Sequence, residues 1–321
     1  MPSSPSSWVE PQLASPTTVR APGEGWVLER KLDGVRVLAI RSDGRTRLLS
    51  RNRNDVSATY PEIVAALDDQ VGGTDFVVDG EVVAFDDDVV GGHTSFGRLQ
   101  KRIHLTDART IARTGVPVWF HVFDLLRFDG HDVRGLTQLQ RKQALLDLDA
   151  WHDALVYVEH SPADGTSDAF DAACAASWEG LIAKRADAAY RSGRSPAWLK
   201  LKCGRQQELV VGGWVPPTGS RLRLGALLVG FYDDGELVYA GNVGTGFTAA
   251  TLADLRDRLD ALAIDHSPFV NPPRERTAQW VLPELVAQVA FAEWTTAGRL
   301  RHPSFKGLRT DVAPADVRRE P

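Results

Sequence analysis

Short runs of apolar and β-branched residues recur along the chain after about residue 26, a pattern that predicts β-strands. Residues 35–40 and 45–50 flank the turn sequence Ser42-Asp43-Gly44, so we expect them to form a hairpin. The other strands expected in the first two thirds of the chain are residues 75–85, 118–125, 180–184 and 198–202. Apolar residues at helical spacing predict helices at 136–148 and 166–177.

The pattern changes near residue 204, where the strands become shorter and are separated by Pro- and Gly-containing turns. Strands are expected at 208–214, 226–232, 237–243 and 286–294, with one helix at 248–262. Short strands with a single helix are typical of a small Greek-key barrel of the OB-fold type. The sequence therefore predicts an α+β protein in three parts: a loosely ordered lead-in (1–25), a domain of antiparallel sheets with flanking helices (26–204) and an OB-fold β-barrel domain (205–321).

Composition indicates an ordinary globular chain, because 43% of the 321 residues are hydrophobic and 25% are charged. No apolar run has the roughly 20 residues that a membrane helix needs, and the start does not resemble a signal peptide. Two cysteines, Cys174 and Cys203, are too few for a disulfide framework, so we expect a reducing cytoplasm. The net charge of −5 does not exclude nucleic acid, because basic residues concentrate at 20–53 and 299–309.

Candidate chemistry begins at Lys31, which is followed by Asp33 and Gly34 at the end of an expected strand. Glycine allows a sharp turn and the close approach of a phosphate. A lysine is a nucleophile only when its amine is deprotonated, and burial or a nearby metal ion can lower its pKa. Lys31 is therefore a candidate nucleophile, although this short motif alone is a weak signal.

Further polar groups occur where the pattern predicts buried strands. Asp79 and Glu81 interrupt an apolar strand, and carboxylates there are costly unless they meet a cation, a metal ion or a sugar hydroxyl. Lys200 and Lys202 alternate with leucines, so both point to one face and favour an anion between them. Phe123 lies on another buried strand, where core packing is its ordinary role and base stacking its functional one.

The order of these motifs resembles that of ATP-dependent DNA ligases. The matching segments are Lys31-x-Asp33-Gly34, Ser50-Arg51-Asn52, Asp79-Gly80-Glu81, Phe123-Asp124-Leu125-Leu126, Glu179-Gly180-x-x-x-Lys184 and Trp198-x-Lys200-x-Lys202. Segments at 207–214, 225–230, 243–247 and 302–309 are similar to short bacterial ligases of the end-joining type, including the ligase domain of ligase D.

The resemblance implies that Lys31 attacks ATP to form lysyl-AMP, that AMP then passes to a DNA 5′-phosphate, and that a 3′-hydroxyl seals the break. It implies a nucleotide site made of Glu29 near the adenine, Arg36, Glu81, Phe123 stacking on the base, and Lys200 and Lys202 at the α-phosphate. DNA contacts are expected from Arg51 and Arg309. Glu81 and Glu179 would bind Mg²⁺ or Mn²⁺, with Asp33, Asp79 and Asp311 in support.

Two departures from the family pattern stand out. Val312 occupies a position where the family usually has Lys, which predicts slower self-adenylation, and Asn242 replaces a Lys expected to face DNA. The expected partners are duplex DNA with nicks or ends and an end-binding protein, with the chain itself monomeric, cytoplasmic and associated with the nucleoid. An RNA ligase or capping-type nucleotidyltransferase, and a DNA-binding module with impaired turnover, are the alternatives.

Overall fold

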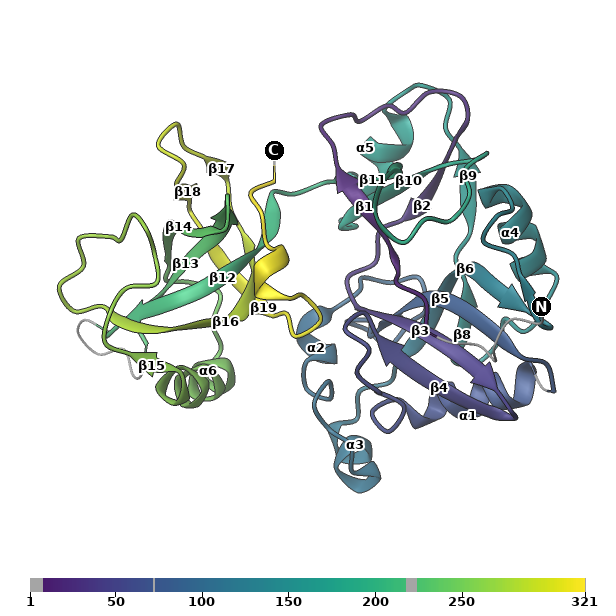
Figure 1. Cartoon of the computed structure of the whole chain (residues 1–321), viewed down its shortest axis with the longest axis horizontal. Helices are drawn as coiled ribbons and strands as arrows, with labels where there is room; N and C mark the ends of the chain where they lie inside the picture. Colours follow the sequence, from purple (N-terminus) through teal and green to yellow (C-terminus); the bar gives the residue numbers. More distant parts are fainter. Residues whose placement is uncertain (1–7, 72, 218–223, 321) are drawn as a thin grey trace. The chain divides into compact units, whose positions relative to one another are not determined.

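The computed structural model describes residues 8–71, 73–217 and 224–320. The chain divides into two compact units between Cys203 and Gly204 (Figure 1). Each unit is built mainly from antiparallel strands with a few short helices, which confirms the α+β class.

The first unit contains two sheets. Sheet one has the strand order β4-β3-β5-β6-β7, with β8 paired to β6. Its strands are β3 (Val35–Ser42), β4 (Arg45–Ser50), β5 (Phe76–Val83), β6 (Trp119–Phe128), β7 (His131–Asp132) and β8 (Leu155–Tyr157). Sheet two has the order β1-β11-β10-β2-β9, formed by β1 (Gln12–Pro16), β2 (Trp26–Arg30), β9 (His160–Pro162), β10 (Gly180–Arg185) and β11 (Gly193–Lys202).

The alternation of side chains along β3 explains why the sheets stack. Val37 packs in a core with Ile63 of helix α1 (Pro61–Gln70), on one face of sheet one. Leu38 points the other way and packs in a second core with Trp198 of sheet two. Strand residues alternate between faces, so sheet one is covered by a helix on one side and by sheet two on the other.

The outer face of sheet two is covered by helix α5 (Asp168–Ala175), whose Phe170 packs with Leu181 and Leu201. Cys174 and Cys203 form a disulfide with a Cα–Cα distance of 5.1 Å, which joins α5 to the chain after β11. The sequence analysis gave these cysteines no such role, because a pairing across 29 residues depends on how α5 lies against the sheet.

Two other expectations were wrong. The lead-in is not wholly loose, because β1 pairs in parallel with β11. The strand expected at 286–294 is instead the end of β16 (Gln279–Ala290) followed by β17 (Glu293–Trp294). Helices α1, α2 (Phe96–Leu99) and α3 (Ala108–Thr114) were not expected, whereas α4 (Gln138–Leu146) and α5 fall inside predicted helices.

The second unit is a sheet of order β14-β13-β12-β16-β15, with β19 (Ser304–Leu308) also paired to β16. Its other elements are β12 (Gln206–Val215), β13 (Ala226–Asp233), β14 (Glu236–Val243), α6 (Ala249–Ala261), β15 (Ala263–Ile264), β18 (Leu300–Arg301) and a short 3₁₀ helix, Pro314–Asp316. The arrangement is of the OB-fold type, although the strand pairing among residues 204–217 and 224–320 does not close into a barrel.

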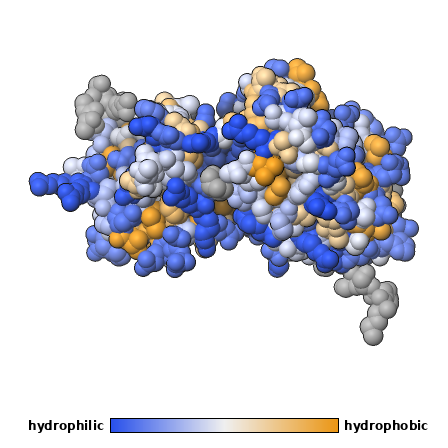
Figure 2. All heavy atoms as spheres, turned by 90° about the horizontal axis from the view of Figure 1, so that it is seen from above, coloured by the Kyte–Doolittle hydropathy of each residue, from blue (hydrophilic) through white to orange (hydrophobic). Residues whose placement is uncertain are grey.

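The surface carries no large apolar area on the face drawn in Figure 2, where hydrophobic residues form small separate patches among hydrophilic ones. Within the part of the chain that the structure describes, no helix is both long and apolar enough to cross a membrane.

Candidate active site

The site is organised by the segment 31–34, which connects β2 of sheet two to β3 of sheet one. At its start, the Lys31 N–H donates to the Gly180 carbonyl of sheet two at 3.0 Å. At its end, the Gly34 N–H donates to Glu81 Oε1 of sheet one at 3.0 Å. A Cβ at Gly34 would lie 2.2 Å from the Val82 carbonyl oxygen, so only glycine fits this close approach.

The Lys31 amine lies against acidic groups. Its Nζ is 2.5 Å from Glu179 Oε2, and the two side chains are only 19% and 7% exposed. Burial acts to lower the pKa of Lys31, but the charges of Glu179, Glu81 and Asp33 outweigh it, and the pKa is raised. The expected shift was a lowered pKa, and the structure shows the opposite direction: the neighbouring carboxylates favour the protonated amine.

Gly180 determines where Glu179 lies. Its φ of +146° is one that side-chain-bearing residues rarely adopt, and an added Cβ would lie 1.9 Å from the Leu201 carbonyl oxygen. The close packing of β10 on β11 therefore requires glycine directly after Glu179. Position 179 is held next to Lys31 by backbone packing, in addition to the ion pair.

One face of sheet two carries most of the predicted anion and base contacts. Lys200 and Lys202 alternate with Leu199 and Leu201, and the leucines pack on the α5 side. The two lysines therefore share the opposite face with Trp198, which packs between the sheets. The predicted pair of cations on one face is present.

Glu29 lies on the same face of sheet two and is 3% exposed. It forms ion pairs with two buried lysines, Lys184 at 2.6 Å and Lys142 of α4 at 3.1 Å. Burial lowers the pKa of Lys184, opposed by the charge of Glu29. Two buried lysines therefore share this one carboxylate.

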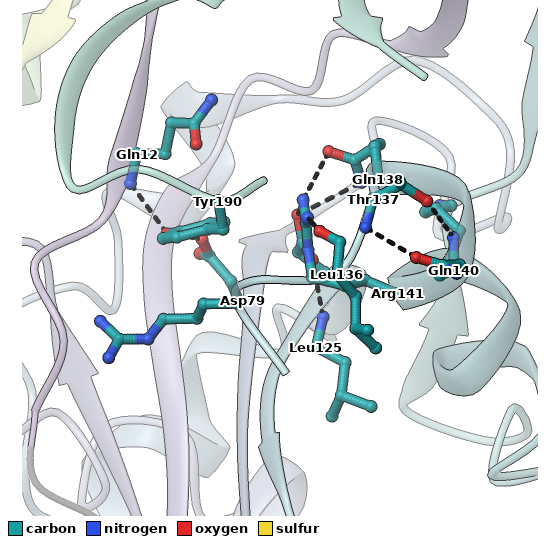
Figure 3. A network of polar contacts seen from close by, with 12 residues as sticks. Gln12, Asp79, Leu125, Leu136, Thr137, Gln138, Gln140, Arg141 and Tyr190 are labelled. Atoms are coloured by element: carbon teal, nitrogen blue, oxygen red, sulfur yellow. Dashed lines mark hydrogen bonds and ion pairs between the residues drawn. The ribbon is translucent and has the colours of Figure 1, made fainter. Parts of the chain in front are cut away.

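The facing side of sheet one carries a second buried ion pair. Arg36 contacts Asp79 through Nε and Nη2 at 2.5 and 2.6 Å, and Asp79 has no exposed surface. The Tyr190 hydroxyl donates to the same carboxylate at 2.6 Å (Figure 3). The cation that the buried Asp79 was expected to need is thus Arg36.

Phe123 occupies a β-bulge. Asp79 pairs with Asp124 and Gly80 with Val122, so Phe123 is an extra residue between them. A bulge redirects the side chain it carries, and Phe123 packs between the two sheets. The Arg36 guanidinium and the Lys184 amine lie 4.6 and 4.5 Å from its ring centroid.

Three predicted residues lie elsewhere. Arg51 follows β4 at the edge of sheet one. Arg309 and Asp311 belong to the second unit, where they form a two-point ion pair at 2.9 and 2.8 Å. Val312 packs against the apolar core of that unit.

The sequence analysis gave no role to four buried polar residues that adjoin these groups: Lys184, Gln138, Arg141 and Lys142. The last three lie on α4 at positions i, i+3 and i+4. That spacing could have been recognised as one helix face, but polar residues there normally indicate a solvent-exposed surface.

Metal binding would depend on few protein ligands. In the described ranges, no group of three or more His, Cys, Asp or Glu residues is arranged to hold a metal ion. Glu81 and Glu179 both act on the Lys31 amine, so two carboxylates lie near it. Two carboxylates and substrate phosphates are a donor set that suits Mg²⁺.

Comparison with known proteins agrees with this arrangement. Residues 11–202 match the family described as ATP dependent DNA ligase domain, and residues 220–312 match ATP dependent DNA ligase C terminal region. The multifunctional non-homologous end joining protein LigD of Pseudomonas aeruginosa is 37% identical over 97% of this chain and 36% of its own length. The corresponding Mycobacterium tuberculosis protein is 40% identical over 97% of this chain and 40% of its own length.

A solved structure of mycobacterial DNA ligase D complexed with ATP and MES is also similar. It is 37% identical, with a TM-score of 0.68, and the match covers 97% of this chain and 98% of that one. The chain spans less than half the length of the two end-joining relatives. On the family matches and this similarity, the chain belongs to the ATP-dependent DNA ligases.

Proposed function

We propose that this chain seals 5′-phosphate/3′-hydroxyl breaks in duplex DNA, with Lys31 as the residue that carries AMP. The observation that supports this most directly is the position of the Lys31 amine, which lies 2.5 Å from Glu179 at the junction of the two sheets. The facing sides of these sheets carry Glu29, Phe123 and the pair Lys200 and Lys202. A nucleophile, an aromatic ring and phosphate-binding cations are the groups that nucleotidyl transfer requires.

In the first transfer, Lys31 Nζ would form a bond to the α-phosphorus of ATP while the bond to the β-phosphate oxygen breaks. Pyrophosphate leaves, and the amine proton passes to solvent or to a neighbouring carboxylate. The DNA 5′-phosphate then takes AMP from Lys31, and the 3′-hydroxyl finally displaces AMP. Storing the activated phosphate on the protein divides one difficult reaction into easier steps.

The protein would contribute mainly position and charge. Lys200 and Lys202 would hold the α-phosphate, Phe123 would stack on the base, and Glu29 would lie beside the adenine. Arg36, held by Asp79, would contact the ribose and DNA side. Preorganised charges of this kind are the main source of rate in phosphoryl transfer.

Glu81 and Glu179 are the residues that would bind Mg²⁺ or Mn²⁺, with Asp33 in support. When bound there, a divalent ion would neutralise developing phosphate charge, and these carboxylates would then favour the ammonium form of Lys31 less. Arg51 and Arg309 would contact DNA, with Asp311 orienting Arg309.

The cellular role we propose is DNA repair by end joining, because the proteins matched over nearly the whole chain carry that name. In this role the chain would act as a monomer on DNA nicks or ends, with an end-binding protein as its partner.

The test is incubation of the full chain with ATP labelled at the α-phosphate and Mg²⁺, followed by mass spectrometry. We expect one adenylate on Lys31, removal of it by added pyrophosphate, and none in Lys31→Arg. Adenylation followed by sealing of a nicked DNA duplex supports the proposal. Sealing of RNA alone would favour an RNA ligase, and DNA binding without adenylation would favour a module that has lost turnover.

A further inference from the structure

Helix α4 contributes a buried polar cluster that none of the proposed roles uses. Arg141 and Asp124 have no exposed surface and are joined by hydrogen bonds of 2.7 and 3.0 Å. Gln138, also fully buried, lies against Arg141 (Figure 3) and is hydrogen-bonded to Asp124 as well. Asp124 directly follows Phe123 and lies opposite Asp79, so the cluster adjoins the base side of the site.

The neighbours of Gln138 determine the orientation of its side-chain amide. Nε2 donates to Asp124 Oδ2 at 3.2 Å, and a carboxylate can only accept. Oε1 therefore faces the other way, where it accepts from Arg141 Nη2 at 2.9 Å and from the Trp198 indole Nε1–H at 3.1 Å. A flip of this amide would oppose like groups at all three contacts, so the acceptor offered to Trp198 is fixed.

Trp198 connects Gln138 to Phe123, the ring proposed to stack on the base. Its ring packs edge-on against Phe123, with centroids 6.1 Å apart, and edge-on against Tyr190 at 5.7 Å. The Lys184 amine lies 4.1 Å from the Trp198 ring centroid. The indole is 3% exposed, and Gln138 accepts the hydrogen bond of its nitrogen. Rotation of the indole would therefore disturb the ring assigned to base stacking.

We propose that Gln138 is a positioning residue for the nucleotide base: its amide oxygen holds the Trp198 indole, which in turn fixes the Phe123 ring on which adenine stacks. This inference rests on the proposed function, since it needs a nucleotide at Phe123. The base is distant from the reacting α-phosphate, so a loosened stack weakens the ground state and the transition state alike. The effect should therefore appear in the ATP concentration needed for half-maximal adenylation, not in the rate at saturation.

The experiment measures single-turnover formation of lysyl-AMP against ATP concentration in the full chain. Gln138→Met keeps the side-chain length and removes the acceptor, and we expect the half-saturating ATP concentration to rise roughly tenfold, with the saturated rate within about twofold of the parent. Gln143→Met is the matched control. Gln143 is exposed on the same helix, and the side-chain hydrogen bond described for it goes to Asp147, which lies on its own surface turn. The control should match the parent in both quantities.

A second pair of variants separates positioning from general stability. Trp198→Phe removes the indole N–H, so adding Gln138→Met to it should change the half-saturating ATP concentration by less than about twofold. Should Gln138→Met not fold, Gln138→Asn retracts the acceptor by one methylene and should give a smaller rise in the same quantity.

The proposal would be overturned if Gln138→Met raised the half-saturating ATP concentration equally in the parent and in Trp198→Phe. It would also be overturned if a folded Gln138 variant had the same half-saturating ATP concentration as the parent. A fall confined to the saturated rate would also overturn it. Failure of the parent chain to form lysyl-AMP would instead remove the proposed function.

Discussion

The buried Arg141–Asp124 pair allows a quantitative test of how the first unit is held together. Arg141→Met removes both hydrogen bonds to Asp124, the one to Gln138 Oε1, and those to the Leu136 and Ala188 carbonyls. The carboxylate would keep only the Gln138 amide and the Leu125 N–H. Removing one partner of a fully buried ion pair leaves an uncompensated charge and costs about 3–5 kcal/mol.

Hydrogen exchange by mass spectrometry of the full chain measures this cost within the first unit alone. The slowest amides of β6 should exchange roughly 150 to 4,000 times faster in Arg141→Met, the factor that corresponds to about 3–5 kcal/mol. Arg134→Met is the control, because the Arg134–Asp132 pair is 32% and 39% exposed. Its loss should cost less than about 1 kcal/mol.

A second change in the same background tests the cause. If the penalty comes from the isolated charge, Asp124→Asn added to Arg141→Met should recover more than half of the lost protection. Exchange in Arg141→Met that is less than about fivefold faster than in the parent would refute the argument, because less than about 1 kcal/mol would then have been lost. A double variant no better protected than Arg141→Met would refute the assignment to charge.

Four further outcomes are expected. Gly180→Ala should slow lysyl-AMP formation by about 100-fold, because the added Cβ has no room and would displace the Glu179 carboxylate. Gly135→Ala is the control and should have no effect, because the space around Gly135 is open. The rate of lysyl-AMP formation at saturating ATP and limiting Mg²⁺ should rise with pH through the neutral range, since the raised pKa of Lys31 makes the neutral amine the minor form wherever the ion does not occupy the carboxylates; a flat profile would contradict this. Val312→Lys should speed lysyl-AMP formation by supplying a cation at the departing pyrophosphate, with thermal unfolding of the variant as the check on its packing; an unchanged or slower rate would count against it. Burial lowers the pKa of His121 to about 3 from 6.5, so as the pH falls the unfolded chain takes up this proton before the folded chain does. The free energy of unfolding should therefore fall below pH 6.5, by up to about 1.4 kcal/mol per pH unit from this residue. Urea titrations of His121→Phe at several pH values should show a pH dependence that is smaller by this amount.

Strand periodicity explains much of what the sequence could predict. Lys200 and Lys202 alternate with leucines, and the structure places both on the face that also carries Trp198. The hairpin at 35–50 followed from an apolar, β-branched run and from a turn that only certain residues allow. Strand periodicity and turn residues depend only on residues that are close in the chain, so one sequence is enough to recognise them.

Contacts between distant segments were less accessible. Lys31 and Glu179 are 148 residues apart, and only the resemblance to a known motif order suggested that they act together. The bulge at Phe123 arises from how β6 pairs with β5, which no local pattern specifies. Helix α1 is different, because Pro61 at its start and the spacing of Ile63 and Leu67 would have predicted it.

The bridge between Cys174 and Cys203 has a mechanical consequence. Cys203 is the last residue of the first unit, so a pull on the connecting chain is shared between α5, through the bridge, and the Glu179 carbonyl, to which the Cys203 N–H donates at 3.0 Å. The bridge therefore gives tension at the connection a second, covalent path into the first unit. In a reducing compartment the bridge would open, and the whole of that tension would pass through Cys203 to the paired strands β10 and β11.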